Sequence, residues 1–190
     1  MIHETSRLVL RPWSETDAES LYEHAKNVNI GPAAGWPIHT SVENSAEIIR
    51  GVLSADENYA VTLKNENKAI GSIGLMIGAK SNMNIGENEA EIGYWIGEPY
   101  WGQGLIPEAV RELMHYAFGA LSMTTLWCGY FDGNEKSKRA QEKCGFKFHH
   151  TENNVKWQIT NEIKTIHITC IHRDEWNNFA CGSTSKKGAV

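Results

Sequence analysis

One stretch of the chain, residues 89–121, changes its hydrophobic period halfway along. Every second residue from Ala90 to Ile96 is apolar, which is the period of a β-strand. Pro99 and the Gly102-Gln103-Gly104 turn then end the strand. From Val110 to Leu121, apolar residues recur at the spacing of a helix with one buried stripe. The stretch therefore predicts a strand, a glycine turn and an amphipathic helix.

A strand that enters a helix through a glycine turn is a common anion site, because the first N–H groups of a helix lack intrahelical partners. Two familiar nucleotide motifs are excluded. A dinucleotide fingerprint needs a third glycine where this chain has Pro107, and a Walker A loop needs a Gly-Lys-Ser/Thr sequence that the turn lacks. Spacing alone leaves two interpretations open: a phosphate site and a plain strand-to-helix turn.

Composition narrows the class of protein. The 190 residues, 41% hydrophobic and 22% charged, are enough for one globular domain with its own core. The net charge of −5 and the lack of a basic run argue against nucleic acid as a partner, and an acidic surface suits a cationic acceptor such as an amine. No apolar stretch has the length of a signal peptide core or a membrane span, so we expect no membrane contact.

Cysteine and histidine positions argue against a bound metal. The four cysteines lie far apart with no CxxC pair, which fits a reducing compartment and leads us to expect a cytoplasmic protein. The histidines of the C-terminal part fall on expected strands, with no cysteine or carboxylate at ligand spacing. The residues concerned are Cys128, Cys144, Cys170, Cys181, His149, His150, His167 and His172.

Periodicity and turn residues divide the chain into alternating elements. We expect strands at 7–13, 58–63, 70–78, 91–96, 124–131, 146–149 and 163–171, and helices at 18–25, 42–53, 110–121 and 134–144. Residues 29–39 are expected to form a loop, and Asn153-Asn154 a turn. The order is too irregular for a doubly wound fold and indicates a mixed sheet with helices on its faces. We expect one domain over residues 1–176 and a disordered tail over residues 177–190.

Three motifs together resemble a known family. The sequence EIGYWI at 91–96, followed by YWGQGL at 100–105 and Glu108, is similar to the cofactor motif of the GNAT superfamily of N-acetyltransferases. The pattern of Asn134, Ser137, Lys143, Gly145 and Phe146 resembles the helix and turn that follow this motif in the family. The sequence RLVLR at 7–11 resembles the Rim-type branch, whose named members acetylate the N-termini of ribosomal proteins. The resemblance covers residues 5–176.

The resemblance implies an α/β domain of the α+β type, with a mixed, largely antiparallel sheet, helices on both faces, and acetyl-CoA as the donor. In the family, backbone N–H groups of the glycine turn bind the pyrophosphate, and the preceding strand pairs with the pantetheine amides. These roles fall on Trp101, Gly102, Gln103, Gly104, Leu105 and Ile106 for the pyrophosphate, and on Tyr94, Trp95 and Ile96 for pantetheine. Asn134 is expected to bond pantetheine or to cap its helix. Pro99 departs from the Gln or Arg that often opens the motif.

Amide formation from a thioester needs a neutral amine and a protonated leaving thiolate. Many family members use a tyrosine as the acid, and its position here is Gln141. We expect Ser137 to donate the proton instead, against the alternative of a small buried serine that bonds its own helix. Glu91 is the candidate base, with a structural carboxylate as the equal alternative. Among Lys136, Lys138, Arg139 and Lys143, one cation is expected near the adenosine phosphate.

The expected reaction is direct transfer of acetyl from acetyl-CoA to a primary amine. The acceptor indicated by the resemblance is the α-amine of a protein N-terminus, and the alternatives are a small amine or a CoA-binding module without turnover. Aromatic candidates for the acceptor wall are Trp13, Trp36, Trp127 and Tyr130. An exposed strand edge would allow a homodimer.

Overall fold

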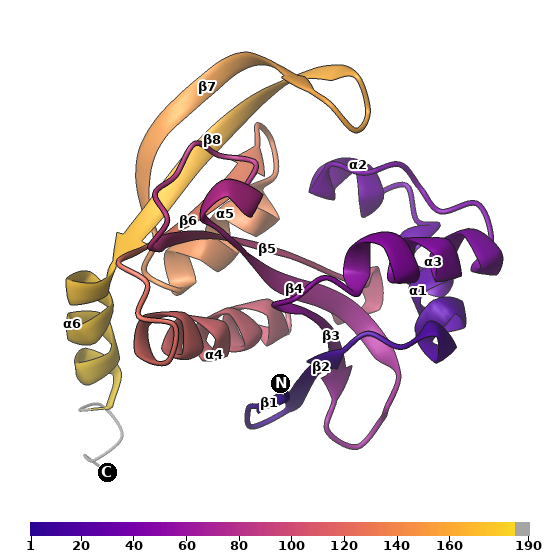
Figure 1. Ribbon diagram of the computed structural model, residues 1–190, viewed down its shortest axis with the longest axis horizontal. Coiled ribbons are helices and arrows are strands. Elements are labelled where there is room, and N and C mark those ends of the chain that lie inside the picture. Colours follow the sequence, from indigo (N-terminus) through magenta and orange to yellow (C-terminus); the bar gives the residue numbers. More distant parts are fainter. Residues whose placement is uncertain (185–190) are drawn as a thin grey trace.

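The strands assemble into one mixed sheet of eight (Figure 1). The computed structural model describes residues 1–184, with side-chain surroundings as far as residue 178. The order across the sheet is β1-β2-β3-β4-β5-β6-β8-β7, and every neighbouring pair is antiparallel except β5 and β6. The strands are β1 (His3–Glu4), β2 (Leu8–Pro12), β3 (Asn58–Leu63), β4 (Ala69–Ile77), β5 (Glu89–Ile96), β6 (Thr125–Phe131), β7 (Lys147–Trp157) and β8 (Glu162–His172). This confirms the expected mixed, largely antiparallel sheet.

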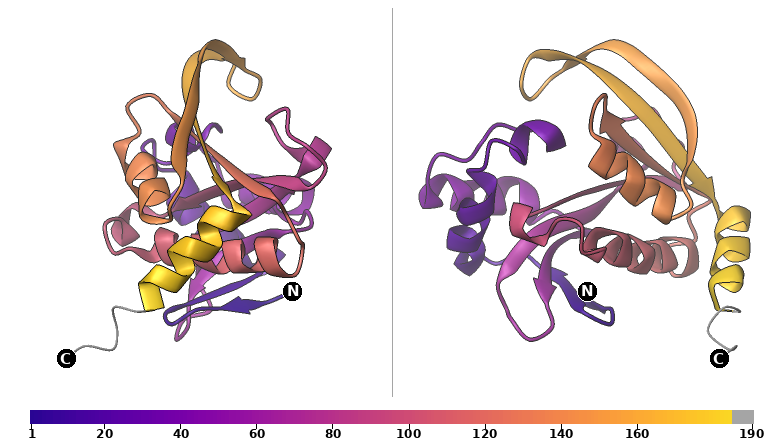
Figure 2. Two further views of the ribbon diagram at one scale, coloured as in Figure 1. Left: turned by 90° about the vertical axis from the view of Figure 1, so that its left-hand side faces the viewer. Right: turned by 180° about the vertical axis from the view of Figure 1, so that it is seen from behind.

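Helices cover both faces of the sheet (Figures 1 and 2). They are α1 (Ala18–Ala25), α2 (Gly31–Ala34), α3 (Val42–Ile48), α4 (Leu105–Gly119), α5 (Glu135–Lys143) and α6 (Arg173–Thr184). The first layer, with α1 and α3, packs on Ala60 and Ala69, and α3 continues into a π-helical turn over Ile49–Leu53. The second layer, with α4, packs on the opposite face against Val61 and Ile92.

The buried stripe of α4 forms the centre of the larger core. Val110, Leu113, Met114 and Ala117 are at most 1% exposed, as the helical spacing predicts. Leu8 and the other inward residues of β2 to β5 meet them from the sheet. Burying one side chain of this size stabilises the fold by about 1.5–3 kcal/mol. The packing of this stripe on the sheet therefore holds α4, with its first turn, in place.

Three parts of the sequence prediction differ from the structure in the following way. The expected loop at 29–39 contains the single turn of α2, and β1 was not expected. Asn153 and Asn154 lie inside β7 at a register shift, so they form a bulge, and the chain turns at residues 158–161 instead. An Asn pair tolerates a left-handed backbone in a bulge as well as in a turn, and Asn154 has φ +57°.

The start of the expected disordered tail is helical. Helix α6 runs through Thr184, because Trp176 is 4% exposed and packs against His115 and Phe118 of α4. The prediction of disorder is therefore wrong for residues 177–184, and the rest of the predicted tail lies outside the described residues.

The sheet divides between β5 and β6. These strands pair only from Glu89–Glu91 to Thr125–Trp127 and then diverge. Strand β5 keeps its pairing with β4 as far as Ile96. The edge of β5 that faces β6 is consequently unpaired from Ile92 onward. We call this opening the notch.

Candidate active site

The glycine turn connects the end of β5 to the first turn of α4. Gly102 and Gly104 have φ +75° and +74°, a backbone region that side chains disfavour, and a Cβ added at Gly102 would meet nothing within 4 Å. Leu105 begins the helix and Pro107 has no N–H. Among the described residues, no hydrogen bond uses the N–H groups of residues 102–106. The turn therefore presents open backbone donors at the positive end of a helix dipole, as an anion site requires.

Trp101 differs from the other predicted pyrophosphate residues. Its backbone N–H bonds to the Glu98 carbonyl at 3.1 Å, and its indole nitrogen donates to the Ile96 carbonyl at 2.9 Å. The Ile96 carbonyl, assigned to pantetheine from the sequence, is thus already engaged by the turn. Lys136 reaches from α5 and places its ammonium 3.5 Å from the centre of the Trp101 ring. Of the four expected cations, Lys136 is the one that the structure brings onto the turn.

The Glu108 carboxylate holds the turn through hydrogen bonds that no sequence pattern predicted. Glu108 accepts hydrogen bonds from Thr5 Oγ1 at 2.6 Å, Arg7 N at 2.9 Å and Arg7 Nε at 2.7 Å. Arg7 Nη1 also donates to the Gln103 carbonyl at 3.1 Å. Burial raises the pKa of Glu108, but the hydrogen bonds from Thr5, Arg7 and Ser6 outweigh burial and hold this pKa at about 2. The segment before β2 is thereby fixed to the start of α4.

Ser137 lies inside the notch, on the first turn of α5. Its Oγ is 3.1 Å from the Tyr94 hydroxyl and 3.1 Å from Gln141 Nε2. Asn134 caps the helix by accepting from Ser137 N at 3.1 Å, so the capping role expected for it is confirmed. The amide of Asn134 also donates to the Ala33 carbonyl of α2 at 3.2 Å. The inward direction predicted for Ser137 is correct, and its partner Tyr94 comes from β5.

Gln141 has a fully formed set of partners at the position of the family's tyrosine. It is 2% exposed, donates to the Gly129 carbonyl at 3.2 Å, and accepts from Thr169 Oγ1 at 2.8 Å. Burial raises the pKa of the neighbouring Tyr94 phenol well above its ordinary value. Tyr94 is therefore neutral at any physiological pH and acts only as a hydroxyl group.

Glu91 occupies the last paired position of β5, at the closed end of the notch. Its Oε2 accepts from Ser81 Oγ at 2.8 Å and from Asn82 N at 2.9 Å. Its Oε1 has no hydrogen bond within the described part of the chain, and the carboxylate is 8% exposed. Among the described residues, no hydrogen bond joins Glu91 to Ser137. The expected base is thus held by the loop after β4, apart from the expected acid.

Aromatic side chains close the face of the notch opposite α4. Trp36 meets Trp95 edge to face with ring centres 5.8 Å apart, and its other neighbour is His39 at 5.3 Å. The Trp157 indole donates to the Gly35 carbonyl at 2.6 Å, so the loop with α2 spans from the first layer to the β7–β8 arm. Trp36 therefore lies against β5, and its role in an acceptor wall stays a prediction.

The other aromatic candidates lie elsewhere. Trp13 is 7% exposed and its indole nitrogen donates to Ser72 Oγ at 3.2 Å, so its place in the acceptor wall stays a prediction. Trp127 bonds Glu89 at the paired end of β6. Tyr130 stacks near His167 on the diverging part of β6, with ring centres 5.0 Å apart.

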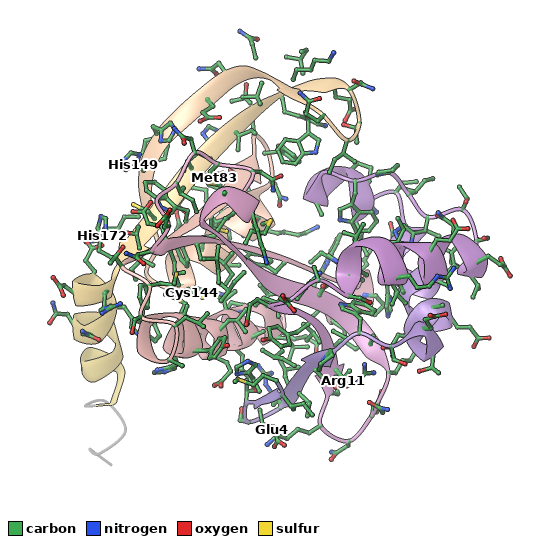
Figure 3. All side chains as sticks on the ribbon, in the orientation of Figure 1. Glu4, Arg11, Met83, Cys144, His149 and His172 are labelled. Carbon is green, nitrogen blue, oxygen red and sulfur yellow. The ribbon has the colours of Figure 1, made fainter. Side chains whose placement is uncertain are left out.

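The histidines of the C-terminal part lie on the last two strands. His149 lies on β7 and His172 at the end of β8 (Figure 3). Among the described residues, no group of three or more His, Cys, Asp or Glu side chains is arranged to hold a metal ion. Within the same residues, no helix is both long and apolar enough to cross a bilayer.

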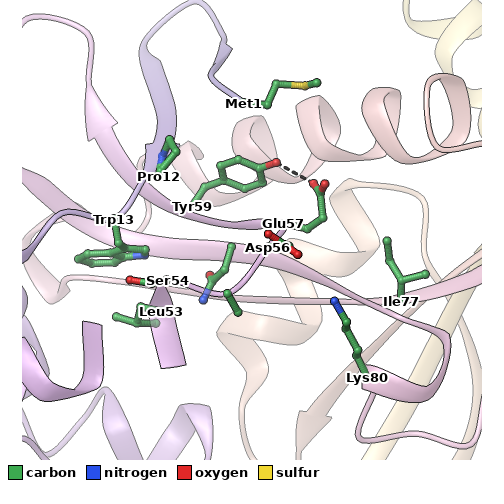
Figure 4. A pocket seen from close by; sticks show the side chains of 12 residues that line it. Met1, Pro12, Trp13, Leu53, Ser54, Asp56, Glu57, Tyr59, Ile77 and Lys80 are labelled. Carbon is green, nitrogen blue, oxygen red and sulfur yellow. Dashed lines mark hydrogen bonds between the residues drawn. The ribbon is translucent and has the colours of Figure 1, made fainter. Parts of the chain in front are cut away.

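A pocket of about 430 Å³ lies at the opposite end of β4 from the glycine turn (Figure 4). Trp13, Asp56, Glu57 and Tyr59 line it, and Glu57 accepts a hydrogen bond from the Tyr59 hydroxyl at 2.7 Å. Because Ile77, at the far end of β4, also lines it, this pocket is separate from the notch.

Comparison with known proteins agrees with this geometry. The acetyltransferase (GNAT) domain matches residues 7–147. The chain belongs to the GNAT acetyltransferase family. It is accordingly an N-acetyltransferase with acetyl-CoA as its donor, and the sequence resemblance is confirmed.

Individual relatives of this GNAT protein are more distant. The uncharacterized N-acetyltransferase YoaA of Bacillus subtilis is 27% identical over 151 residues, which are 77% of this chain and 82% of YoaA. The structure of an acetyltransferase (GNAT family) from Bacillus anthracis is 20% identical, with a TM-score of 0.79 over 92% of this chain and 99% of that one. The ribosomal-protein-S5-alanine acetyltransferase from Vibrio fischeri is 19% identical, with a TM-score of 0.73 over 93% and 98%. Both solved structures share the fold of this chain.

Proposed function

We propose that this acetyltransferase moves the acetyl group of acetyl-CoA to the α-amine of a protein N-terminus by direct attack. The observation that carries the proposal is the notch, an unpaired strand edge between the open glycine turn and Ser137. The Rim-type motif at residues 7–11 and the fold shared with the Vibrio enzyme support a protein as the acceptor.

The donor is held by backbone groups. The N–H groups of residues 102–106 bind the pyrophosphate, and Lys136 beside Trp101 supplies a cation for a phosphate oxygen. The unpaired edge of β5 at Tyr94 and Trp95 accepts the pantetheine amides as a neighbouring strand would accept a peptide. The thioester then lies in the notch beside Ser137.

The transfer proceeds in one chemical sequence. The amine nitrogen attacks the thioester carbonyl carbon, the C–S bond breaks, and its electron pair goes to sulfur. The Ser137 hydroxyl gives its proton to the sulfur, and the proton lost from the nitrogen balances it. Changing Ser137 to Ala should lower kcat about 100-fold with little change in KM for acetyl-CoA, since one general acid contributes about 10²–10⁴-fold.

Glu91 is the proposed acceptor of the ammonium proton, through water, because its Oε1 has no hydrogen bond to any described residue. A Glu91→Gln variant tests this role. Its deficit in kcat/KM should shrink as pH rises toward the amine's own pKa, where the amine is neutral without help. A deficit that is constant with pH, together with a lower Tm, would show that Glu91 only anchors Ser81 and Asn82.

The acceptor class is decided by thiol release from acetyl-CoA with two panels. One contains peptides with free N-termini, matched to peptides with blocked N-termini that keep a lysine. The other contains polyamines, amino acids and amine-bearing antibiotics. Release with free N-termini alone supports the proposal. Release with small amines alone would show that the acceptor is a small cationic amine, a class that the net charge of −5 also suits.

Two coarser proposals complete the description. Cys128, Cys144 and Cys170 are unpaired and buried, which supports a reducing, cytoplasmic location. The outer edge of β7 supports a homodimer, and the mass in solution tests it.

A further inference from the structure

Gln141 has its amide orientation fixed by its surroundings. A backbone carbonyl only accepts hydrogen bonds, so the group 3.2 Å from the Gly129 oxygen must be the amide nitrogen of Gln141. The same nitrogen is 3.1 Å from Ser137 Oγ. The Gln141 oxygen is then left for the Thr169 hydroxyl, at 2.8 Å. Gln141 therefore donates to the Ser137 oxygen and occupies one of its lone pairs.

Tyr94 approaches the same serine from the strand. Its hydroxyl oxygen is 3.1 Å from Ser137 Oγ and 3.2 Å from the Ser137 carbonyl oxygen. The Tyr94 phenol has one hydrogen, and it reaches the Ser137 carbonyl oxygen, which only accepts. When that hydrogen is shared with or turned to Ser137 Oγ, both lone pairs of Oγ are engaged by donors from Gln141 and Tyr94. The serine's own hydrogen must then point away from both donors.

We infer that Gln141 and Tyr94 are positioning residues that direct the Ser137 hydroxyl hydrogen at the sulfur of acetyl-CoA. This inference rests on the proposed function. It also explains how a chain with glutamine in place of the family's tyrosine retains an acid. A serine hydroxyl is a weak acid, and hydrogen bonds donated to its oxygen stabilise that oxygen while its proton moves to sulfur.

The proton movement balances without any further reactant. The electron pair of the breaking C–S bond goes to sulfur, and the Ser137 proton goes with it. Ser137 regains a proton from the attacking nitrogen, which must lose one to become an amide. Gln141 and Tyr94 keep their protons throughout, since burial disfavours a charged Tyr94 and an amide does not titrate.

The test uses bound CoA, so it does not depend on knowing the acceptor. The thiolate of CoA bound to the whole protein is titrated by its ultraviolet absorbance. A hydrogen bond from Ser137 to sulfur should hold the pKa of this thiol below that of free CoA. Gln141→Met and Tyr94→Phe, which keep the shape of each side chain, should each raise it by about one pKa unit, and Ser137→Ala should do the same.

Activity gives the second measurement. Each positioning variant should lower kcat about tenfold, the effect of one lost hydrogen bond, with KM for acetyl-CoA within twofold. In a Ser137→Ala background, adding Gln141→Met should change kcat by less than twofold, because its effect passes through Ser137. Cys144→Ala is the matched control: it truncates a buried residue next to α5 whose thiol contacts the Pro107 carbonyl.

The outcomes separate the inference from the proposed function. If Gln141→Met leaves the thiol pKa unchanged, or lowers kcat equally with and without Ser137, the inference is overturned while the enzyme remains an acetyltransferase. A loss of kcat no greater than in Cys144→Ala would also overturn it. If no amine panel gives turnover but the thiol pKa follows the variants as expected, the acceptor proposal fails and the inference stands. Failure of CoA to bind would overturn both.

Discussion

The carboxylate of Glu108 offers the most quantitative prediction. In Glu108→Gln the side chain keeps its shape but loses its charge, while Thr5 and Arg7 keep donors that were aimed at a carboxylate. The folded pKa of about 2, against an ordinary value of 4.5, corresponds to about 3.4 kcal/mol at 1.36 kcal/mol per pKa unit. The Arg7 side chain is 48% exposed, so solvent screens its interaction with Glu108. We therefore expect the variant to lose only about 1–2 kcal/mol of its free energy of unfolding.

The measurement is urea and thermal unfolding of both proteins between pH 7 and pH 3. At pH 7 the variant should lose about 1–2 kcal/mol, and its Tm should fall by about 2–8 °C. A lowered pKa stabilises the fold above 4.5, and this contribution is lost as pH falls from 4.5 toward 2. The two proteins should therefore converge in acid.

Two results would contradict this account of Glu108. One is equal stability at pH 7, and the other is a difference that stays constant down to pH 3. Glu47→Gln, a change at an exposed position on α3, is the control and should alter neither. Because Arg7 also bonds the Gln103 carbonyl, the variant should raise KM for acetyl-CoA severalfold with kcat little changed.

Three further predictions concern the donor site and pH. Gly102→Ala meets no clash but places a side chain at φ +75°, so it should lower stability by about 1–2 kcal/mol. Acetyl-CoA binding, measured by calorimetry, should weaken at least tenfold. Unchanged binding would show that the turn is not part of the donor site. Lys136→Gln should raise KM for acetyl-CoA about threefold, and more at low salt; an effect independent of salt would exclude a phosphate contact. Burial lowers the pKa of His3, His24 and His39, so the unfolded chain binds protons more readily than the folded chain. Stability should therefore fall as pH drops below 6.5. Denaturant titrations from pH 7.5 to 5 that show flat or rising stability would contradict this.

Local patterns explain why the centre of the site was predictable. The strand, the glycine turn and the helix stripe of residues 89–121 depend on neighbours in the chain, and each appears where its period places it. The inward direction of Ser137 follows from its offset to Ala140 and Cys144 on one helix face. Such features need no knowledge of tertiary contacts.

Contacts distant in sequence explain what was missed. Glu108 meets Arg7 across a separation of 101 residues, and Gln141 meets Thr169 across 28. No hydrophobic period or sequence motif predicts contacts between residues so far apart in the chain. The alternation of β5 put Tyr94 on one face with Ala90 and Ile92, yet only the fold shows that its hydroxyl ends beside Ser137. Helix α6 was missed because its sequence is polar and its one anchor, Trp176, needs α4 as a partner.

The divergence of β5 and β6 also affects whether the protein aggregates through an exposed strand edge. Unpaired strand edges usually recruit strands from neighbouring molecules and lead to aggregates. This edge lies in the middle of a continuous sheet, with β4 on one side and β6 beyond the gap on the other. Only a slender, extended molecule can enter between two strands, and a folded protein cannot. The unpaired edge of β5 is thus accessible to the small donor acetyl-CoA but not to the strands of another copy of the enzyme.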